Sequence, residues 1–210
     1  MSSVAITGNA AGAGVFTIAS PNSASSFTAT LPAATTTLVG TDATQTLTNK
    51  TIQGGAITSG TAVASTSGTS IDFTSIPSWV KRVTVMLSGV SQSATANILV
   101  QLGTGSTTYT TSGYIASSIN CENAGSTTTS STSGFVVFTS AAASIISGHM
   151  VITNISGNNW VSSHTTKKNT TNLVFGGGDV SLGAVLTAVR ITTTNGTDTF
   201  DAGSINLLFE

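Results

Sequence analysis

The side chains that could carry acid–base, nucleophilic or metal chemistry are few in this 210-residue sequence: two histidines, one cysteine and seven acidic residues. Neither His149 nor His164 has a Cys, Asp or Glu at a spacing usual for a metal-ligand pair. Cys121 could act as a nucleophile only if the fold brought a histidine beside it, and no nucleophile motif surrounds it. The pattern therefore favours histidines on strands and a buried cysteine over a metal centre or a thiol active site.

A pair of carboxylates would allow a second kind of chemistry, the hydrolysis of glycosidic bonds. Asp198 and Asp201 flank an Asn-Gly turn, where aspartates commonly accept hydrogen bonds from the turn backbone. No motif selects two acids as a general acid and base, so the sequence predicts no catalytic residues and no enzyme. A small carbohydrate-active enzyme is the alternative, and its candidate carboxylates are Asp72, Glu122, Asp179, Asp198 and Asp201.

The run Gly176-Gly177-Gly178 is the only glycine-rich stretch that invites comparison with a phosphate-binding loop. No Lys-Ser/Thr pair follows it and no helical pattern begins there, so it lacks the groups that hold a phosphate. Asp179 beside it is a single carboxylate, too few for a calcium site. The sequence predicts a turn at these glycines, and no cofactor.

Surface recognition is the chemistry that the remaining residues allow. Aromatic rings stack on sugar faces, and loops on a rigid β-sandwich often hold binding sites. The polar segment 123–134 is predicted to be the most exposed tip, and Trp160 has core packing as an equally good interpretation. The candidate receptor contacts, at or near predicted strand ends and loops, are Tyr109, Tyr114, Trp160, His164, Lys167 and Lys168.

Composition excludes several classes of protein. Charged residues are only 6% of the chain, against roughly 25% in an average domain, and the net charge is −1, so no basic patch can neutralise nucleic-acid phosphates. No stretch approaches the ~20 apolar residues that span a bilayer, so membrane insertion is not expected. The first residues lack a secretory signal pattern, which predicts synthesis in a cytoplasm. Weak repulsion between nearly neutral copies favours self-association.

The elements that must position any site are predicted to be strands. Ser and Thr make up about a third of the chain, while the charged residues that fill helix surfaces are scarce. Alternating apolar residues predict strands around Val83–Val90 and Ala94–Thr104, and the Asn195-Gly196 turn predicts a hairpin. About nine short strands at this spacing are typical of an antiparallel β-sandwich resembling a jelly roll. Trp79, after Pro77, is expected to anchor a turn.

The chain divides into three segments by composition: an arm at 1–52, a Gly/Ser/Thr linker at 53–69 with one short strand near 61–65, and a domain at 70–210. The arm has short strand-like stretches that bury too little apolar surface to offset the entropy of ordering them. We therefore expect the arm to order against copies of itself or a docking partner. Its packing residues are predicted to be Val4, Ile6, Phe16, Ile18, Phe27, Leu31, Leu47 and Ile52.

Four stretches carry a resemblance to a known class of proteins. Leu47-Thr-Asn-Lys-Thr-Ile52 resembles a phrase found in tail fibres of tailed bacteriophages and related virion appendages, near the junction of an attachment arm and a distal β-domain. The preceding Leu31-Pro-Ala-Ala-Thr-Thr-Thr-Leu-Val39 is similar to the phrase that often comes before it. Residues 71–90 and 189–209 resemble C-terminal domains of phage tail proteins.

The resemblance implies a structural protein of the virion, made in the cytoplasm of the bacterial host. It implies a homotrimer whose arm docks to other tail or capsid proteins and whose distal domain contacts the host surface, with a glycan as one such contact. A capsid decoration or head-fibre protein is the alternative within the same class.

Overall fold

The computed structural model describes residues 12, 24, 26, 57–142 and 144–210. Residues 57–142 and 144–210 belong to one compact unit of antiparallel strands, and these described residues contain no helix. The packing residues expected in the arm, from Val4 to Ile52, lie outside the described residues. No helix in the described part of the chain is long and apolar enough to cross a membrane.

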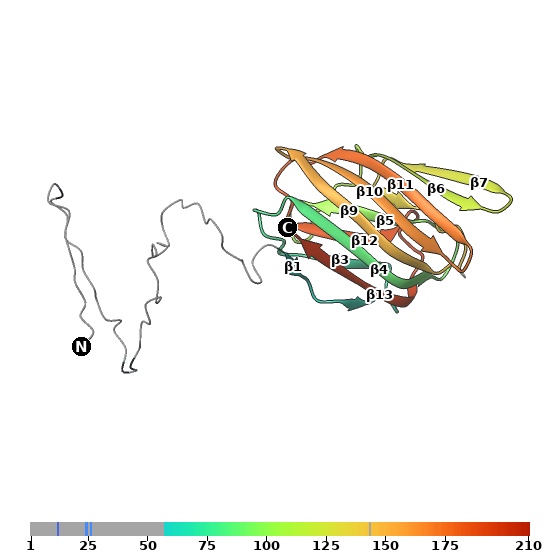
Figure 1. Cartoon of the computed structure of the whole chain (residues 1–210), viewed down its shortest axis with the longest axis horizontal. Coiled ribbons are helices and arrows are strands. Elements are labelled where there is room, and N and C mark those ends of the chain that lie inside the picture. Colours follow the sequence, from blue (N-terminus) through green and yellow to red (C-terminus); the bar gives the residue numbers. More distant parts are fainter. Residues whose placement is uncertain (1–11, 13–23, 25, 27–56, 143) are drawn as a thin grey trace, which may run out of the picture. The chain divides into compact units, whose positions relative to one another are not determined.

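The strands form two sheets that face each other (Figure 1). The large sheet has nine strands in the order β1-β13-β4-β9-β10-β11-β6-β7, with β2 also paired to β13. These strands are β1 Thr58–Ser59, β2 Val63–Ala64, β4 Arg82–Gln92, β6 Ile115–Glu122, β7 Gly125–Ser131, β9 Ile146–Ser156, β10 Asn159–Lys168, β11 Asn172–Ser181 and β13 Phe200–Phe209. The small sheet has the order β3-β12-β5-β8, formed by β3 Ser70–Phe73, β5 Ile98–Gly103, β8 Phe135–Val137 and β12 Ala188–Thr193.

The strand order is that of an expanded jelly roll. A jelly roll places two four-stranded sheets face to face and passes the chain repeatedly between them. Here β3-β12-β5-β8 forms one such sheet, and β4, β6 and β7 supply three strands of the other. The place of its fourth strand, between β4 and β6, is taken by the meander β9-β10-β11, and β13 is added outside β4. The predicted antiparallel sandwich is confirmed.

The core lies between the sheets and is made by alternation along the strands. Val83, Val85 and Leu87 of β4 point inward and are at most 4% exposed, and each such side chain stabilises the fold by about 1.5–3 kcal/mol on burial. Tyr114 and Phe135 meet edge to face with 5.0 Å between ring centroids. The Tyr114 hydroxyl accepts a hydrogen bond from the Leu102 amide at 2.8 Å, which satisfies its polar end inside the core.

The structure corrects three expectations about local elements. The glycine run 176–178 lies in the middle of β11 and is not a turn, since it pairs with β10 and β6. Glycine is needed at 176 because a Cβ atom there would overlap the His164 ring of β10. Most of the polar segment 123–134 is not a loop but strand β7, which forms a hairpin with β6. Trp79 does not anchor its turn in the core, since 53% of it is exposed.

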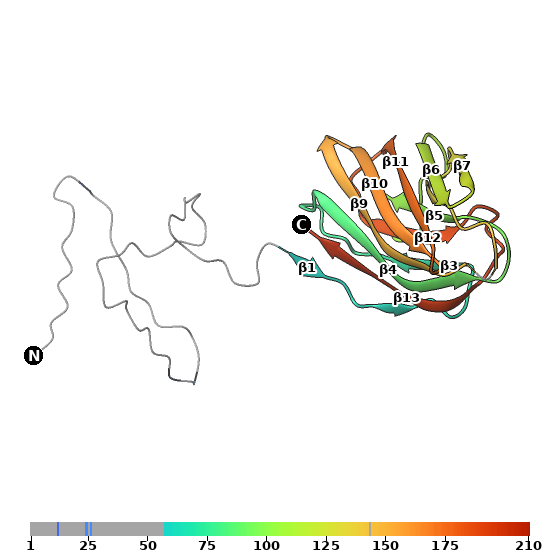
Figure 2. The ribbon, with the colours of Figure 1, turned by 45° about the vertical axis from the view of Figure 1, so that its right-hand side comes forward.

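The segment assigned to a linker contributes to the large sheet. Strands β1 and β2 pair with β13, and β2 coincides with the short strand expected near 61–65 (Figure 2). The Gly60 amide donates to the Leu207 carbonyl at 2.8 Å, and the buried Ser65 hydroxyl donates to the Ala202 carbonyl at 2.8 Å. Residues 58–65 therefore cover the edge of β13.

Candidate binding groove

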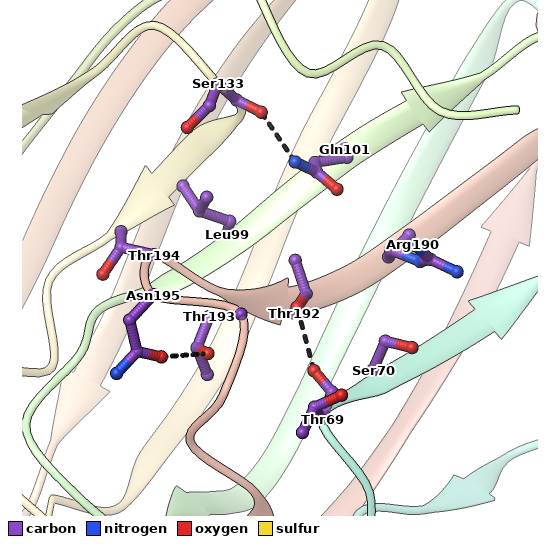
Figure 3. A pocket seen from close by; sticks show the side chains of 11 residues that line it. Thr69, Ser70, Leu99, Gln101, Ser133, Arg190, Thr192, Thr193, Thr194 and Asn195 are labelled. Atoms are coloured by element: carbon purple, nitrogen blue, oxygen red, sulfur yellow. Dashed lines mark hydrogen bonds between the residues drawn. The ribbon is translucent and has the colours of Figure 1, made fainter.

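A polar groove of about 360 Å³ opens on the outward face of the small sheet (Figure 3). Alternation places it there, because Val189 and Ile191 of β12 point into the core while Arg190 and Thr192 point outward. The neighbouring strands β3 and β5 contribute outward residues at the same register. The groove is lined by Thr69, Ser70, Leu99, Gln101, Ser133, Arg190, Thr192, Thr193, Thr194, Asn195 and Gly196.

An ion pair fixes one end of the groove. Arg190 donates from Nε and Nη2 to the two carboxylate oxygens of Asp72, each at 2.7 Å. Its guanidinium carbon lies 4.1 Å from the centroid of the Tyr109 ring. The hydrogen bond to Asp72 raises the pKa of Arg190, and burial followed by the charge of Asp72 raises the pKa of the Tyr109 hydroxyl. The positive charge is thus paired and held in one orientation.

Uncharged polar groups make up the rest of the groove. Gln101 donates its amide to the Ser133 carbonyl at 2.8 Å, which turns its amide oxygen away from Ser133 (Figure 3). The Thr192 hydroxyl donates to the Thr69 carbonyl at 2.8 Å. These groups are already ordered by contacts within the protein, so a ligand would pay little entropy to order them. Leu99 lies beneath the lining and is only 2% exposed, so the open surface of the groove is polar.

The six predicted receptor contacts do not come together at one site. Tyr109 is half-buried beside the groove, and Lys167 is exposed on the outward face of the large sheet. The other four are buried, and this corrects the expectation that they contact a receptor, because their side chains pack inside the sandwich: Tyr114, Trp160, His164 and Lys168.

Each buried residue has an interior role. Burial raises the pKa of Tyr114 to about 12. Trp160 is 3% exposed within the hydrophobic core, as its alternative interpretation predicted. The Lys168 ammonium lies 4.8 Å from the centroid of the Phe138 ring, a cation–π contact that compensates part of its lost hydration.

His164 and Ser118 form the one histidine–hydroxyl pair of interest, with Nε2 and Oγ 3.1 Å apart. The pair lies inside the sandwich, and burial lowers the pKa of His164 to about 4. Ser118 Oγ also accepts from the Phe138 amide at 3.2 Å, and among the described residues His164 Nδ1 has no partner that could orient the ring. Without solvent access or a third group, this arrangement does not match a nucleophilic triad.

Among the described residues, the acids other than Asp72 and the exposed Asp179 are held by structural partners. Asp198 accepts from the Ala96 backbone amide at 2.9 Å and from the Asn195 side-chain amide at 2.6 Å. The backbone amides of the turn donate to Asn195 Oδ1, so the residue that caps the turn is Asn195 and not Asp198 as predicted. Asp201 accepts from Ser91, and Glu122 accepts from Asn120 and Asn172. Within residues 57–142 and 144–210, no group of three or more His, Cys, Asp or Glu side chains could hold a metal ion.

Sequence reasoning missed the groove because its residues are distant in the chain. Asp72, Gln101 and Arg190 lie on β3, β5 and β12, and only the strand order brings them together. One signal was present: Arg190 stands between Val189 and Ile191, where alternation turns a charged residue outward on an otherwise apolar strand. In comparisons with known proteins, no family model, curated protein or solved structure matches the chain.

Proposed function

We propose that this chain is a non-enzymatic structural protein of a tailed-bacteriophage virion, a tail fibre or tail-tip protein. Residues 1–52 attach it to other virion proteins, and the β-sandwich contacts the host surface. The resemblance of residues 31–52, 71–90 and 189–209 to phage appendage proteins supports the class. The observation that carries the host contact is the groove of preordered polar groups around Gln101 and Arg190.

The chemistry of the groove suits an uncharged saccharide of a host-surface glycan. Hydroxyl, amide and guanidinium groups can hydrogen-bond sugar hydroxyls. The volume of about 360 Å³ lies at the lower end of the ~300–1,000 Å³ range of small-molecule pockets, which suits one or two sugar rings. Because Asp72 neutralises Arg190, the groove gives no net attraction to an acidic sugar.

Binding of the purified full chain to an array of bacterial surface glycans tests the host contact. Losing a hydrogen bond to a charged donor costs about 1.5–3 kcal/mol, so Arg190→Ala is expected to weaken binding at least about tenfold. Gln101→Ala is expected to weaken it as well. Arg82→Ala is the matched control, since Arg82 also forms an ion pair, with Glu210, but lies on the large sheet.

Absence of glycan binding by the intact chain, or equal binding by all three variants, would reject the groove as the host contact. Circular dichroism melts of each variant separate lost binding from lost folding. Antibody labelling of intact virions tests the location: label on the tail supports a fibre or tail-tip protein, whereas label on the head supports the capsid decoration alternative. The mass of the purified chain tests the homotrimer that the resemblance implies.

A further inference from the structure

The outward face of the large sheet carries large apolar side chains that no other described element covers. Phe175 and Leu173 of β11 are 38% and 47% exposed, and Ile115 of β6 is 73% exposed. Figure 1 shows these strands side by side in one layer, with the small sheet behind them. The solvated face of an antiparallel sheet is normally polar, and contiguous exposed apolar patches mark interaction surfaces.

Two neighbouring cross-strand rows run through the middle of this face. They are defined by the registers of β10, β11 and β6. The first, which we name the phenylalanine row, has two large apolar residues, and the second, the glycine row, has only small ones. The phenylalanine row is Thr165, Phe175 and Ile119, and the glycine row is Ser163, Gly177 and Ser117. A hollow of about 340 Å³ lined in part by Ser117 and Phe175 opens here.

On β10, β11 and β6 the next row on each side carries one charge. Where the aspartate row reaches β4 it also holds Arg82, whose charge is paired with Glu210. The lysine row, beside the phenylalanine row, contains exposed Lys167 with Leu173 and Cys121. The aspartate row, beside the glycine row, contains exposed Asp179 with Val161 and Ile115. At ~3.3 Å per residue, the lysine and aspartate rows lie roughly 20 Å apart along the strands. Within the described part of the chain neither Lys167 nor Asp179 forms an ion pair.

We propose that a second copy of this chain docks face to face on this surface, about a twofold axis that runs across the strands between the phenylalanine and glycine rows. This symmetry exchanges the rows in pairs. The phenylalanine row of each copy meets the glycine row of the other, so Phe175 faces Gly177 and Ile119 faces Ser117. The lysine row meets the aspartate row, so Lys167 and Asp179 of opposite copies lie one strand spacing of about 4.8 Å apart sideways, across the ~10 Å that separates packed sheets. A lysine side chain can span that gap.

The pattern is self-complementary in shape and in charge, as an isologous interface requires. The register of β9 with β10 continues the four rows onto β9, and that of β4 with β9 continues all but the lysine row onto β4, so across five strands the rows cover roughly 20–25 Å in each direction. That is on the order of 500 Å² from each copy, close to the ~1,000 Å² total that a specific interface needs. The contact involves the large sheet alone, so it does not rest on the groove or on the proposed function.

Light scattering of the full chain and charge-reversal variants tests the proposal. The mass of the unaltered chain is expected to be an even multiple of the 20.9 kDa chain at high concentration, which means six chains if the homotrimer that the resemblance implies docks through this face. Lys167→Glu and Asp179→Lys each place like charges opposite one another, so each is expected to halve the mass. The double variant Lys167→Glu/Asp179→Lys restores opposite charges and is expected to restore the mass. Lys81→Glu, a reversal at an exposed residue outside the four rows, is the control.

A second variant blocks the face by shape. Ser163→Trp fills the glycine row from an exposed position, leaves the core untouched, and is expected to halve the mass as well. Melting curves verify that each variant is folded. An odd multiple for the unaltered chain, or a mass that neither charge reversal nor Ser163→Trp changes, would overturn the proposal. Loss of mass without recovery in the double variant would overturn the row pairing.

Discussion

At the scale of single residues, His164 shows how alternation decides between a binding role and a core role. Trp160, Ser162 and His164 occupy every second position of β10, so the strand must turn all three toward the same side. Interpreting Trp160 as a core anchor therefore implies that His164 is buried too. The predicted receptor contact at His164 was wrong because the strand alternation that buries Trp160 also buries His164, four residues later on the same side of β10.

The burial of His164 predicts that acid destabilises the fold. Its pKa is about 4 in the folded chain and ordinarily 6.5, so the unfolded state binds the proton first as the pH falls. The stabilisation is fully present above pH 6.5 and is lost as the pH falls toward 4, by about 3 kcal/mol in total. Urea unfolding across this pH range measures it.

Two histidine variants test this assignment, one as the change and the other as its control. His164→Gln is expected to flatten the pH dependence of the free energy of unfolding between pH 6.5 and 4, whatever its effect at neutral pH. His149→Gln replaces the exposed histidine of the neighbouring strand and is expected to leave the slope unchanged. If the two variants show equal slopes, the titration of His164 does not drive the acid response.

At the scale of elements, the strands that read clearly from the sequence are those with strict alternation. Ile98, Val100 and Leu102 of β5 face the core together, as their spacing predicts. Strand β7 was missed because its Ser and Thr residues have no apolar face to reveal a period, and only pairing with β6 makes it a strand. The strand position of the β11 glycines was missed because glycine is required there by the close approach of residues on β10 and β6, which the local sequence does not show.

Gly176→Ala is expected to lower the free energy of unfolding. The added Cβ would overlap the His164 ring and the Ser117 carbonyl, and forcing atoms into a filled interior costs about 1–3 kcal/mol. Gly183→Ala is the control, because nothing lies within 4 Å of a Cβ at that exposed position. Thermal melts compare the two. Equal stability would mean that β11 shifts at little cost, contrary to the close packing described.

At the scale of the whole molecule, the class of fold was predictable and the strand order was not. Alternation identifies which residues point inward, but the local sequence of β4 does not indicate that it pairs with β9 and β13. The groove depends entirely on that order, since Asp72 and Arg190 meet only because β3 and β12 are neighbours. Predicting the site from sequence would have required long-range pairing that hydrophobic patterning does not encode.

The strand pairs along β13 predict where a stable domain begins. A chain that starts at residue 57 keeps β1, β2 and the buried Ser65, whereas one that starts at residue 67 uncovers the edge of β13. We expect the shorter chain to melt at a lower temperature and to aggregate, because an uncovered edge offers unpaired backbone groups to other chains. Equal melting temperatures and equal solubility would mean that residues 57–66 contribute nothing to the sheet.

The meander β9-β10-β11 has a consequence for how this architecture can evolve. Three strands are an odd number, so the chain leaves β11 in the direction that a single strand would have taken, and both flanking partners stay antiparallel. A hairpin could therefore be duplicated or deleted at this place without reversing any other strand. The large sheet can therefore gain or lose strands only two at a time at this place. Proteins that share this topology could differ in the number of strands in the large sheet while the small sheet stays the same.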